Sequence, residues 1–117
     1  VLCGVVRRNE VRGHATAEVQ ISDAGSAPLL EANVVHSGKG AGVLVRGGGG
    51  GVMRGNEVYS HALANVRVAC DGSTCFLERN TIHHGDDVGV AVVNGRAYLS
   101  ANAIAHTRKA GVLARGA

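Results

Sequence analysis

The stretch LERNTIHHGDDVGVAV, residues 77–92, contains a pattern that recurs along the whole chain. Its anchor is an Asn followed two positions later by a β-branched residue, as in Asn80 and Ile82. The anchor occurs five times, at Asn9, Asn33, Asn56, Asn80 and Asn102. The spacings are 24, 23, 24 and 22 residues, so the 117-residue chain is an array of repeats of nearly constant length.

Three further columns are apolar when the repeats are aligned on this Asn. The residues three before Asn are Val6, Leu30, Met53, Leu77 and Leu99. Those ten after it are Val19, Val43, Val66, Val90 and Val112, and those twelve after it are Ile21, Val45, Val68, Val92 and Ala114. Each repeat therefore carries short alternating segments bounded by turn residues, without an apolar stripe at helical spacing.

A unit of this length with short strands and no helix cannot bury its apolar face alone. Stacking equivalent strands at roughly 4.8 Å per coil completes their hydrogen bonds and builds a continuous aliphatic core. The Leu-x-x-Leu-x-Leu frame of leucine-rich repeats is missing. We predict an all-β fold, a right-handed parallel β-helix (solenoid) of about five coils of 22–24 residues, with residues 1–117 as one domain. Because neither end carries a polar cap, we expect this domain to be a fragment of a longer solenoid.

The composition is that of a folded chain without a nucleic-acid or membrane surface. Apolar residues make up 45%, charged residues 18% and aromatic residues 3%, which suits a narrow interior of small aliphatic side chains. The net charge of +3 comes from scattered Arg residues that do not cluster with aromatic rings, so we expect no nucleic-acid partner. The apolar runs are far shorter than a membrane span, so we expect no membrane partner.

The variable stretches between repeats are rich in Gly, Ser, Asp and Asn, and we predict surface turns at residues 22–28, 46–51, 69–75 and 93–97. They contain Cys70 and Cys75, two of the three cysteines. This pair would close a small loop in an oxidising compartment. An odd number of cysteines without regular spacing favours buried small thiols at strand ends instead.

The Asn column is interpreted as structural. Stacked Asn side chains hydrogen-bond to one another and to the backbone along the axis, and Asn tolerates the left-handed conformation of a sharp turn. Two positions before Asn, the charges alternate in sign from coil to coil, which favours pairing on an exposed face. The residues of that column are Arg7, Glu31, Arg54, Glu78 and Ser100.

The densest polar cluster is His83, His84, Asp86 and Asp87, which we take as the candidate binding site. Adjacent carboxylates could serve acid–base chemistry or hold calcium, whereas Asp is also favoured in a turn for local hydrogen bonds. His84 and His106 fall in one column on adjacent coils, but no third ligand for zinc is in register. We expect no metal and no cofactor.

No catalytic set is visible at the predicted outward positions. The column eleven after Asn contains no acid, its members being Gln20, Leu44, Arg67, Ala91 and Leu113. Glu10 and Glu57 share a column but are separated by Val34, and nothing beside them would tune either carboxyl for acid catalysis. We therefore expect that this region binds a macromolecule and breaks no bond itself.

The coils alternate between two styles. SAPLLEANVVHSG, residues 26–38, is echoed by STCFLERNTIHHG, residues 73–85, whereas GGVMRGNEVYS, residues 50–60, is echoed by GVVRRNEV, residues 4–11. This alternation resembles the β-helix region of the F-box-only ubiquitin-ligase adaptors over nearly all of the chain. It is similar, more loosely, to the carbohydrate-binding and sugar-hydrolase repeats of bacterial surface proteins and pectate-lyase-like enzymes.

The closer resemblance implies a protein-binding scaffold without a catalytic residue of its own. It would be the substrate-recognition region of an F-box-type ubiquitin ligase, with a protein as its partner and a location in the cytoplasm or nucleus. The looser resemblance implies a β-helix that binds a polysaccharide or processes it as a lyase, hydrolase or epimerase. Tyr59 or Tyr98 would then stack on sugar rings.

Overall fold

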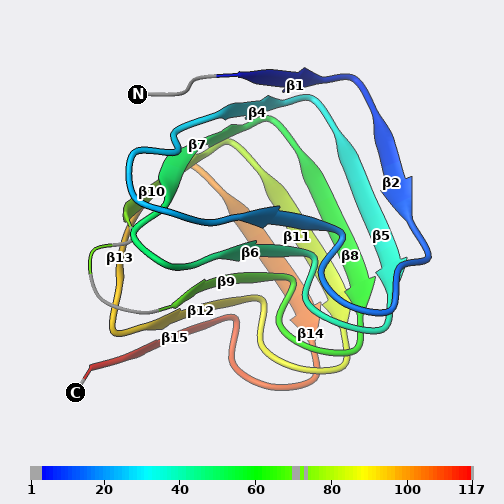
Figure 1. Cartoon of the computed structure of the whole chain (residues 1–117). Helices are drawn as coiled ribbons and strands as arrows, with labels where there is room; N and C mark the ends of the chain where they lie inside the picture. Colours follow the sequence, from blue (N-terminus) through cyan, green and yellow to red (C-terminus); the bar gives the residue numbers. More distant parts are fainter. Residues whose placement is uncertain (1–3, 70–71, 73, 117) are drawn as a thin grey trace.

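Fifteen short strands and no helix form over residues 4–69, 72 and 74–116, which are the part of the chain that this computed structural model describes. The backbone winds around one axis, and each coil lies beside the next (Figure 1). The coil has three sides, and each side stacks into a parallel sheet of five strands. Within the same residues, no helix is long and apolar enough to span a bilayer.

The three sheets take one strand each from every coil. The first sheet contains β1 (Val5–Arg7), β4 (Leu29–Glu31), β7 (Gly50–Arg54), β10 (Thr74–Glu78) and β13 (Arg96–Ser100). The second contains β2 (Glu10–Arg12), β5 (Val34–Gly38), β8 (Glu57–His61), β11 (Thr81–Gly85) and β14 (Ala103–Thr107). The third contains β3 (Val19–Ile21), β6 (Val43–Val45), β9 (Val66–Ala69), β12 (Val90–Val93) and β15 (Val112–Arg115).

The core runs along the inside of the coils and consists of the apolar columns, as the repeat pattern predicts. Val66 pairs with Val43 on one side and Val90 on the other, and all three are 0% exposed. In the middle coils the column three before Asn is also closed, with Met53 at 1% exposure. Val112 is 47% exposed, since only one neighbouring coil covers it. The predicted stack of about five coils is confirmed.

The corner between the first and second sheets is a ladder of Asn side chains. The Oδ1 of Asn80 accepts hydrogen bonds from the backbone N and the Nδ2 of Asn56, at 2.9 and 3.0 Å. Asn56 Nδ2 also donates to the backbone oxygen of Leu30, at 2.9 Å. The same pattern links the whole column from Asn9 to Asn102.

The Asn residues themselves are not in the left-handed conformation, which corrects our expectation. The residue before each Asn has positive φ, and these residues are Arg8, Ala32, Gly55, Arg79 and Ala101. Because the sharp bend comes one residue earlier, the Asn side chain points along the axis between coils. There its Nδ2 donates hydrogen bonds and its Oδ1 accepts them. The residue before each Asn therefore supplies the left-handed conformation of the bend, and the Asn side chain forms the hydrogen bonds of the ladder.

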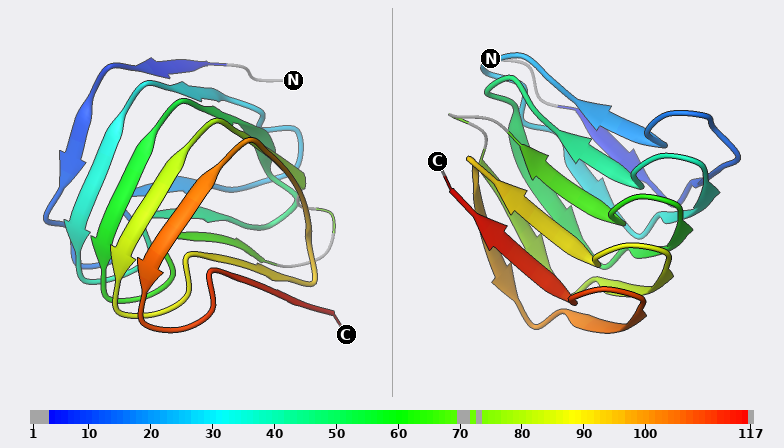
Figure 2. Two further views of the ribbon diagram at one scale, coloured as in Figure 1. Left: turned by 180° about the vertical axis from the view of Figure 1, so that it is seen from behind. Right: turned by 90° about the horizontal axis from the view of Figure 1, so that it is seen from below.

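The corner between the second and third sheets also starts at residues with positive φ. These are Gly13, Ser37, Ser60, His84 and His106, each four positions after an Asn. The chain then bulges outward in a turn before it enters the third sheet, and the turns of successive coils stack on one another (Figure 2). The bulge raises a wall beside the outer face of the third sheet.

Three of the predicted surface turns are shorter than expected. In the stretch 93–97, Val93 belongs to β12 and residues 96–97 belong to β13. Gly50 and Gly51 belong to β7, and Cys75 belongs to β10. Gly51 has φ of 141°, and a Cβ there would lie 2.6 Å from the backbone oxygen of Pro28, so the glycine is required by close packing within a strand. Cys75 is a free thiol with 0% exposure, and burial raises its pKa to about 12. Cys70 lies outside the described residues.

Polar side chains are buried inside the second corner. His61 is 1% exposed, and its Nδ1 lies 2.9 Å from Asn65 Oδ1. Asn65 Nδ2 donates to the backbone oxygen of His83, so Oδ1 faces the imidazole and the proton of neutral His61 sits on Nδ1. Burial lowers the pKa of His61, although the Asn65 hydrogen bond and the charge of Glu18 act in the opposite direction.

We expect the chain to lose stability below about pH 6.5 because of this histidine. The folded-state pKa of His61 lies below the unfolded-state value, so the unfolded chain takes up the proton first as the pH falls. The contribution is complete above the unfolded pKa and decreases by at most about 1.4 kcal/mol per pH unit below it. Urea unfolding at pH 7.5, 6.5 and 5.5 measures the slope, with His61→Leu as the comparison. Equal slopes for the two proteins would contradict the assignment.

Candidate functional site

A groove of about 870 Å³ runs along the outer face of the third sheet. Its floor contains the outward column of that sheet, from Leu44 through Arg67 and Ala91 to Leu113. Its wall is formed by the turns of the second corner, including Lys39 and its neighbours in the adjacent coils. The alternation of the third-sheet strands produces this arrangement, because the valines on either side of Leu44 and Arg67 point into the core.

Most of the groove lining is apolar. Ala64, Val88 and Ala91 pack together outside the main core and close the gap between the turns and the sheet. Leu63 in the wall and Leu113 in the floor are 54% and 37% exposed. The groove therefore has exposed apolar side chains on both its wall and its floor.

The charged side chains of the groove are mainly positive. Lys39, Arg46, Arg67 and Arg115 line it, and none of them forms an ion pair with another described residue. Asp87 is the one carboxylate of the lining; it accepts a hydrogen bond from the backbone N of Val88 and lies 3.5 Å from Lys109 Nζ. Within the described lining there is no His, Glu, Tyr or Cys, so the groove offers attraction for negative charge but lacks a paired acid and base.

The four residues of the predicted binding cluster lie on three different surfaces. Asp87 faces the groove, whereas His84 and Asp86 line a separate small hollow. His83 lies on the outer face of β11. The adjacent carboxylates therefore do not converge on one ion, and across residues 4–69, 72 and 74–116 no three potential ligands gather in a way that could hold a metal.

Two carboxylate–imidazole pairs lie on the outer face of the second sheet, where we expected no acid–base pair. His36 Nε2 is 2.7 Å from Glu10 Oε2, and His83 Nε2 is 2.8 Å from Glu57 Oε2. The hydrogen bond from His36 lowers the pKa of Glu10. Each pair joins a residue one after Asn to a residue three after Asn in the next coil, so reading single columns could not reveal them.

Tyr59 lies between the two histidines of these pairs. Its ring stacks on His36 at 4.9 Å and on His83 at 4.8 Å, with interplanar angles of 7° and 11°. Both faces of the tyrosine are therefore covered by imidazole rings, which leaves no face for a sugar. Tyr98 stacks on Phe76 on the outer face of the first sheet, away from the groove.

The coils, three parallel sheets and Asn ladder define a solenoid protein of the parallel β-helix class. The family described as the right-handed β-helix region matches residues 3–117, so the chain belongs to that family. No curated protein and no solved structure matches the chain significantly. The family match agrees with the predicted fold and handedness. The matched residues include all five coils and the residues that line the groove.

Proposed function

We propose that this β-helix is a protein-binding scaffold that holds an extended, acidic segment of a partner protein along the groove of the third sheet. The observation that carries the proposal is one groove that combines exposed leucines with arginines that form no ion pair with another described residue. Leu63, Arg67 and Leu113 are its clearest members. Arg is enriched at protein interfaces, and clusters of Arg recognise acidic motifs.

The dimensions suit a short extended peptide. The floor from Leu44 to Leu113 crosses four coils, a span of roughly 14 Å at about 4.8 Å per coil. An extended chain advances about 3.3 Å per residue, so four or five residues would cover the floor. Side chains on one face of such a peptide would contact the leucines at some positions and the guanidinium groups of the arginines at others.

A polysaccharide is the second candidate, and the groove favours it less. Sugar rings are commonly held by aromatic side chains and dense polar groups, whereas the described lining has no aromatic ring and buries small aliphatic residues. A polyuronide would satisfy the arginines but leave Leu63 and Leu113 against hydroxyl groups. A lyase, hydrolase or epimerase would also need an acid–base set that the described lining lacks.

We further propose that this scaffold is the substrate-recognition region of an F-box-type ubiquitin-ligase adaptor. It rests on the alternating coil styles of residues 26–38 and 50–60. A rigid groove with a basic and apolar lining supplies what such a region requires, namely a shaped surface for a degradation signal. An F-box in the same polypeptide would support this assignment, and a secretion signal would favour the polysaccharide reading.

We expect Arg67→Glu to weaken the binding of an acidic peptide by about tenfold or more. The probe is a fluorescein-labelled decapeptide of alternating Glu and Leu, titrated with the full chain in an anisotropy assay at two salt concentrations. The substitution replaces attraction with repulsion at the centre of the floor. The matched control is Arg96→Glu, which makes the same charge change on the first sheet and should leave binding unchanged.

Three results would count against the proposal. Absence of binding, or equal binding of a Lys–Leu decapeptide, would remove the charge complementarity on which it rests. Equal weakening by Arg67→Glu and Arg96→Glu would show that only net charge matters. Saturable binding of polygalacturonate that Arg67→Glu abolishes, or turnover to unsaturated products, would favour the carbohydrate function instead.

A further inference from the structure

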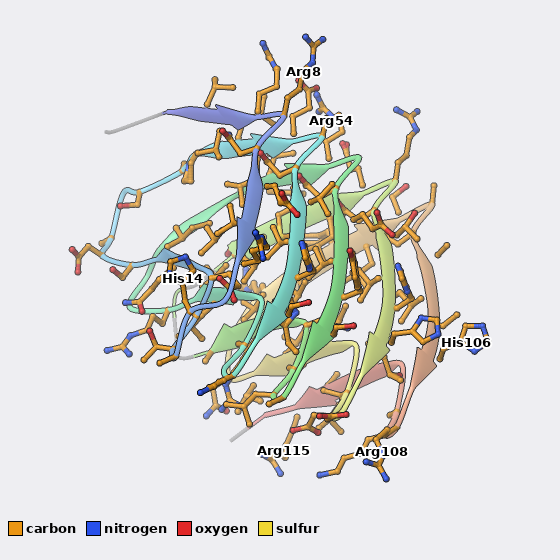
Figure 3. The ribbon with its side chains drawn as sticks, turned by 90° about the vertical axis from the view of Figure 1, so that its right-hand side faces the viewer. Arg8, His14, Arg54, His106, Arg108 and Arg115 are labelled. Carbon is orange, nitrogen blue, oxygen red and sulfur yellow. The ribbon has the colours of Figure 1, made fainter. Side chains whose placement is uncertain are left out.

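The corner that ends the second sheet brings the side chains of adjacent residues together. Along an extended strand, successive side chains point to opposite faces and do not meet. At the end of β5, however, Ser37 has φ of 58°, and its Oγ lies 2.8 Å from Nδ1 of His36. The same conformation at His84 places its Nδ1 2.6 Å from that of His83. The left-handed residue thus turns its side chain toward its predecessor on the outer face of the second sheet, the side that faces the viewer in Figure 3.

Glu10, His36 and Ser37 form a continuous chain of hydrogen bonds across two coils. His36 Nε2 lies 2.7 Å from Glu10 Oε2, and His36 Nδ1 lies 2.8 Å from Ser37 Oγ. A carboxylate only accepts hydrogen bonds, so the proton of neutral His36 is on Nε2 and the lone pair is on Nδ1. The Ser37 hydroxyl therefore donates to Nδ1. A hydroxyl bonded to a base that is itself held by a third group is the arrangement of an activated nucleophile.

The surroundings of His36 hold its ring in this position. Tyr59 stacks on the ring with centroids 4.9 Å apart and planes inclined by 7°. The hydrogen bond from His36 and the charge of Arg12 lower the pKa of Glu10, so this carboxyl is ionised at neutral pH. The side chain of His36 is 14% exposed, whereas Ser37 is exposed at the corner. The base is therefore shielded and oriented, and the hydroxyl is open to a substrate.

Equivalent positions in the next coils each lack one part of this set. Ser60 corresponds to Ser37 and has φ of 60°, but the residue before it is Tyr59 and not a histidine. His83 is paired with Glu57, but the residue after it is His84, which has no hydroxyl. Among the described residues, only Ser37 joins a hydroxyl to an imidazole that is bonded to a carboxylate.

We propose that Ser37 is the nucleophile of a second site, which hydrolyses small carboxylic esters, with His36 as its base and Glu10 as the residue that positions the base. As Ser37 Oγ bonds to the carbonyl carbon of the ester, its proton passes to His36 Nδ1. The bond to the alcohol oxygen then breaks, and His36 returns the proton to the leaving alcohol. Water attacks the acyl-serine in the same way, which releases the carboxylic acid and restores the hydroxyl. Glu10 stabilises the imidazolium that forms in each step.

The position of the three residues indicates the class of substrate. They lie on the outer face of the second sheet and share no residue with the groove lining, so this activity does not depend on the protein-binding function. Because the hydroxyl is open to solvent, we expect an ester with an unhindered acyl carbon, such as an acetyl ester.

An alkyl fluorophosphonate is the first probe, because an activated serine displaces its fluoride and retains the phosphonyl group on Oγ. The full chain is incubated with the probe at pH 7.5, and the adduct is located by peptide mass spectrometry. We expect one adduct, on Ser37, that forms at least about tenfold faster in the folded chain than in urea. p-Nitrophenyl acetate then tests turnover, and the release of nitrophenolate should continue beyond one equivalent per chain.

Substitution of the two corner serines provides a matched comparison. Ser37→Ala should remove both the adduct and the turnover, and Ser60→Ala should retain both. Alanine already has positive φ at Ala32 and Ala101, so the corner can accept it without loss of the fold, which circular dichroism checks. His36→Gln should slow the labelling of Ser37 at least about tenfold, since it removes the base.

The role of Glu10 is tested by Glu10→Gln, with Glu57→Gln as the same change in the other pair. Imidazole ¹⁵N NMR should show neutral His36 protonated on Nε2 in the parent chain and in Glu57→Gln, and a mixture of tautomers in Glu10→Gln. Only Glu10→Gln should slow the labelling. Equal labelling of Ser37 and Ser60, labelling that urea does not slow, or turnover that survives Ser37→Ala would overturn the proposal.

Discussion

Val66→Asp is expected to abolish folding of the chain. Val66 is 0% exposed at the middle of the third sheet, and its side chain points into the column that Val43 and Val90 continue. A carboxylate there would be closed off from water by the coils on both sides, and the described residues of the core cluster include no charged side chain. Burying an unpaired charge costs several kcal/mol even after relaxation of the protein. This penalty is comparable with the entire free energy of unfolding of a small domain.

Circular dichroism and size-exclusion chromatography of the purified variant measure this outcome. Arg67→Asp is the control, since the next residue in the strand points outward into the groove and should accept the same side chain with the β-rich spectrum retained. If Val66→Asp kept a native spectrum and a single compact peak while Arg67→Asp unfolded, the inward and outward faces of β9 would have to be exchanged.

The fold was predictable because two periods coincide in the sequence. The alternation of Val66, Arg67 and Val68 has the period of a strand, and the return of Asn after 22–24 residues has the length of a coil. Each coil repeats the same choice of inward residue, so the signal is reinforced at every repeat. One pattern therefore determines the strands, the register and the core together.

The ends of the strands were less predictable, because local composition and tertiary packing disagree there. The glycine run ending at Gly51 has the composition of a turn, yet its last two residues begin β7. Their backbones pack closely against the backbone oxygens of Thr74 and Pro28 in the neighbouring coils. Cys75 sits in a stretch rich in turn residues, and its burial is fixed by the coils on either side. Sequence propensity describes one coil, whereas these positions are decided by neighbouring coils.

The surface sites were harder still to predict because they join different columns. Glu57 meets His83 only when one coil is placed on the next in register, and the groove arises only when the second-corner turns stand beside the third sheet. Asp86 and Asp87 are adjacent in sequence but line different hollows, since the chain turns between them. The sequence places His83, His84, Asp86 and Asp87 around one turn, without indicating that their side chains lie on different surfaces.

Asn56→Ala is expected to destabilise the stack by about 3 kcal/mol. Asn56 is 2% exposed in the middle of the ladder, where its amide donates to Asn80 and to the backbone oxygen of Leu30 and accepts from Asn33. Alanine removes these bonds and leaves buried partners without a substitute. The penalty for unpaired buried groups exceeds the gain from any single hydrogen bond, so the loss should be larger than that of one ordinary contact.

The position of an Asn within the ladder should determine the size of this effect. Asn9 donates to Asn33 but accepts no hydrogen bond from another Asn, and it is exposed at the first coil. Asn9→Ala should therefore cost less than about 1 kcal/mol, although it makes the same chemical change. Urea unfolding of the two variants and the parent chain at pH 7.5 gives both values. Equal losses would mean that the side chains act through the local turn alone, and a loss below about half a kcal/mol for Asn56→Ala would remove the ladder as a source of stability.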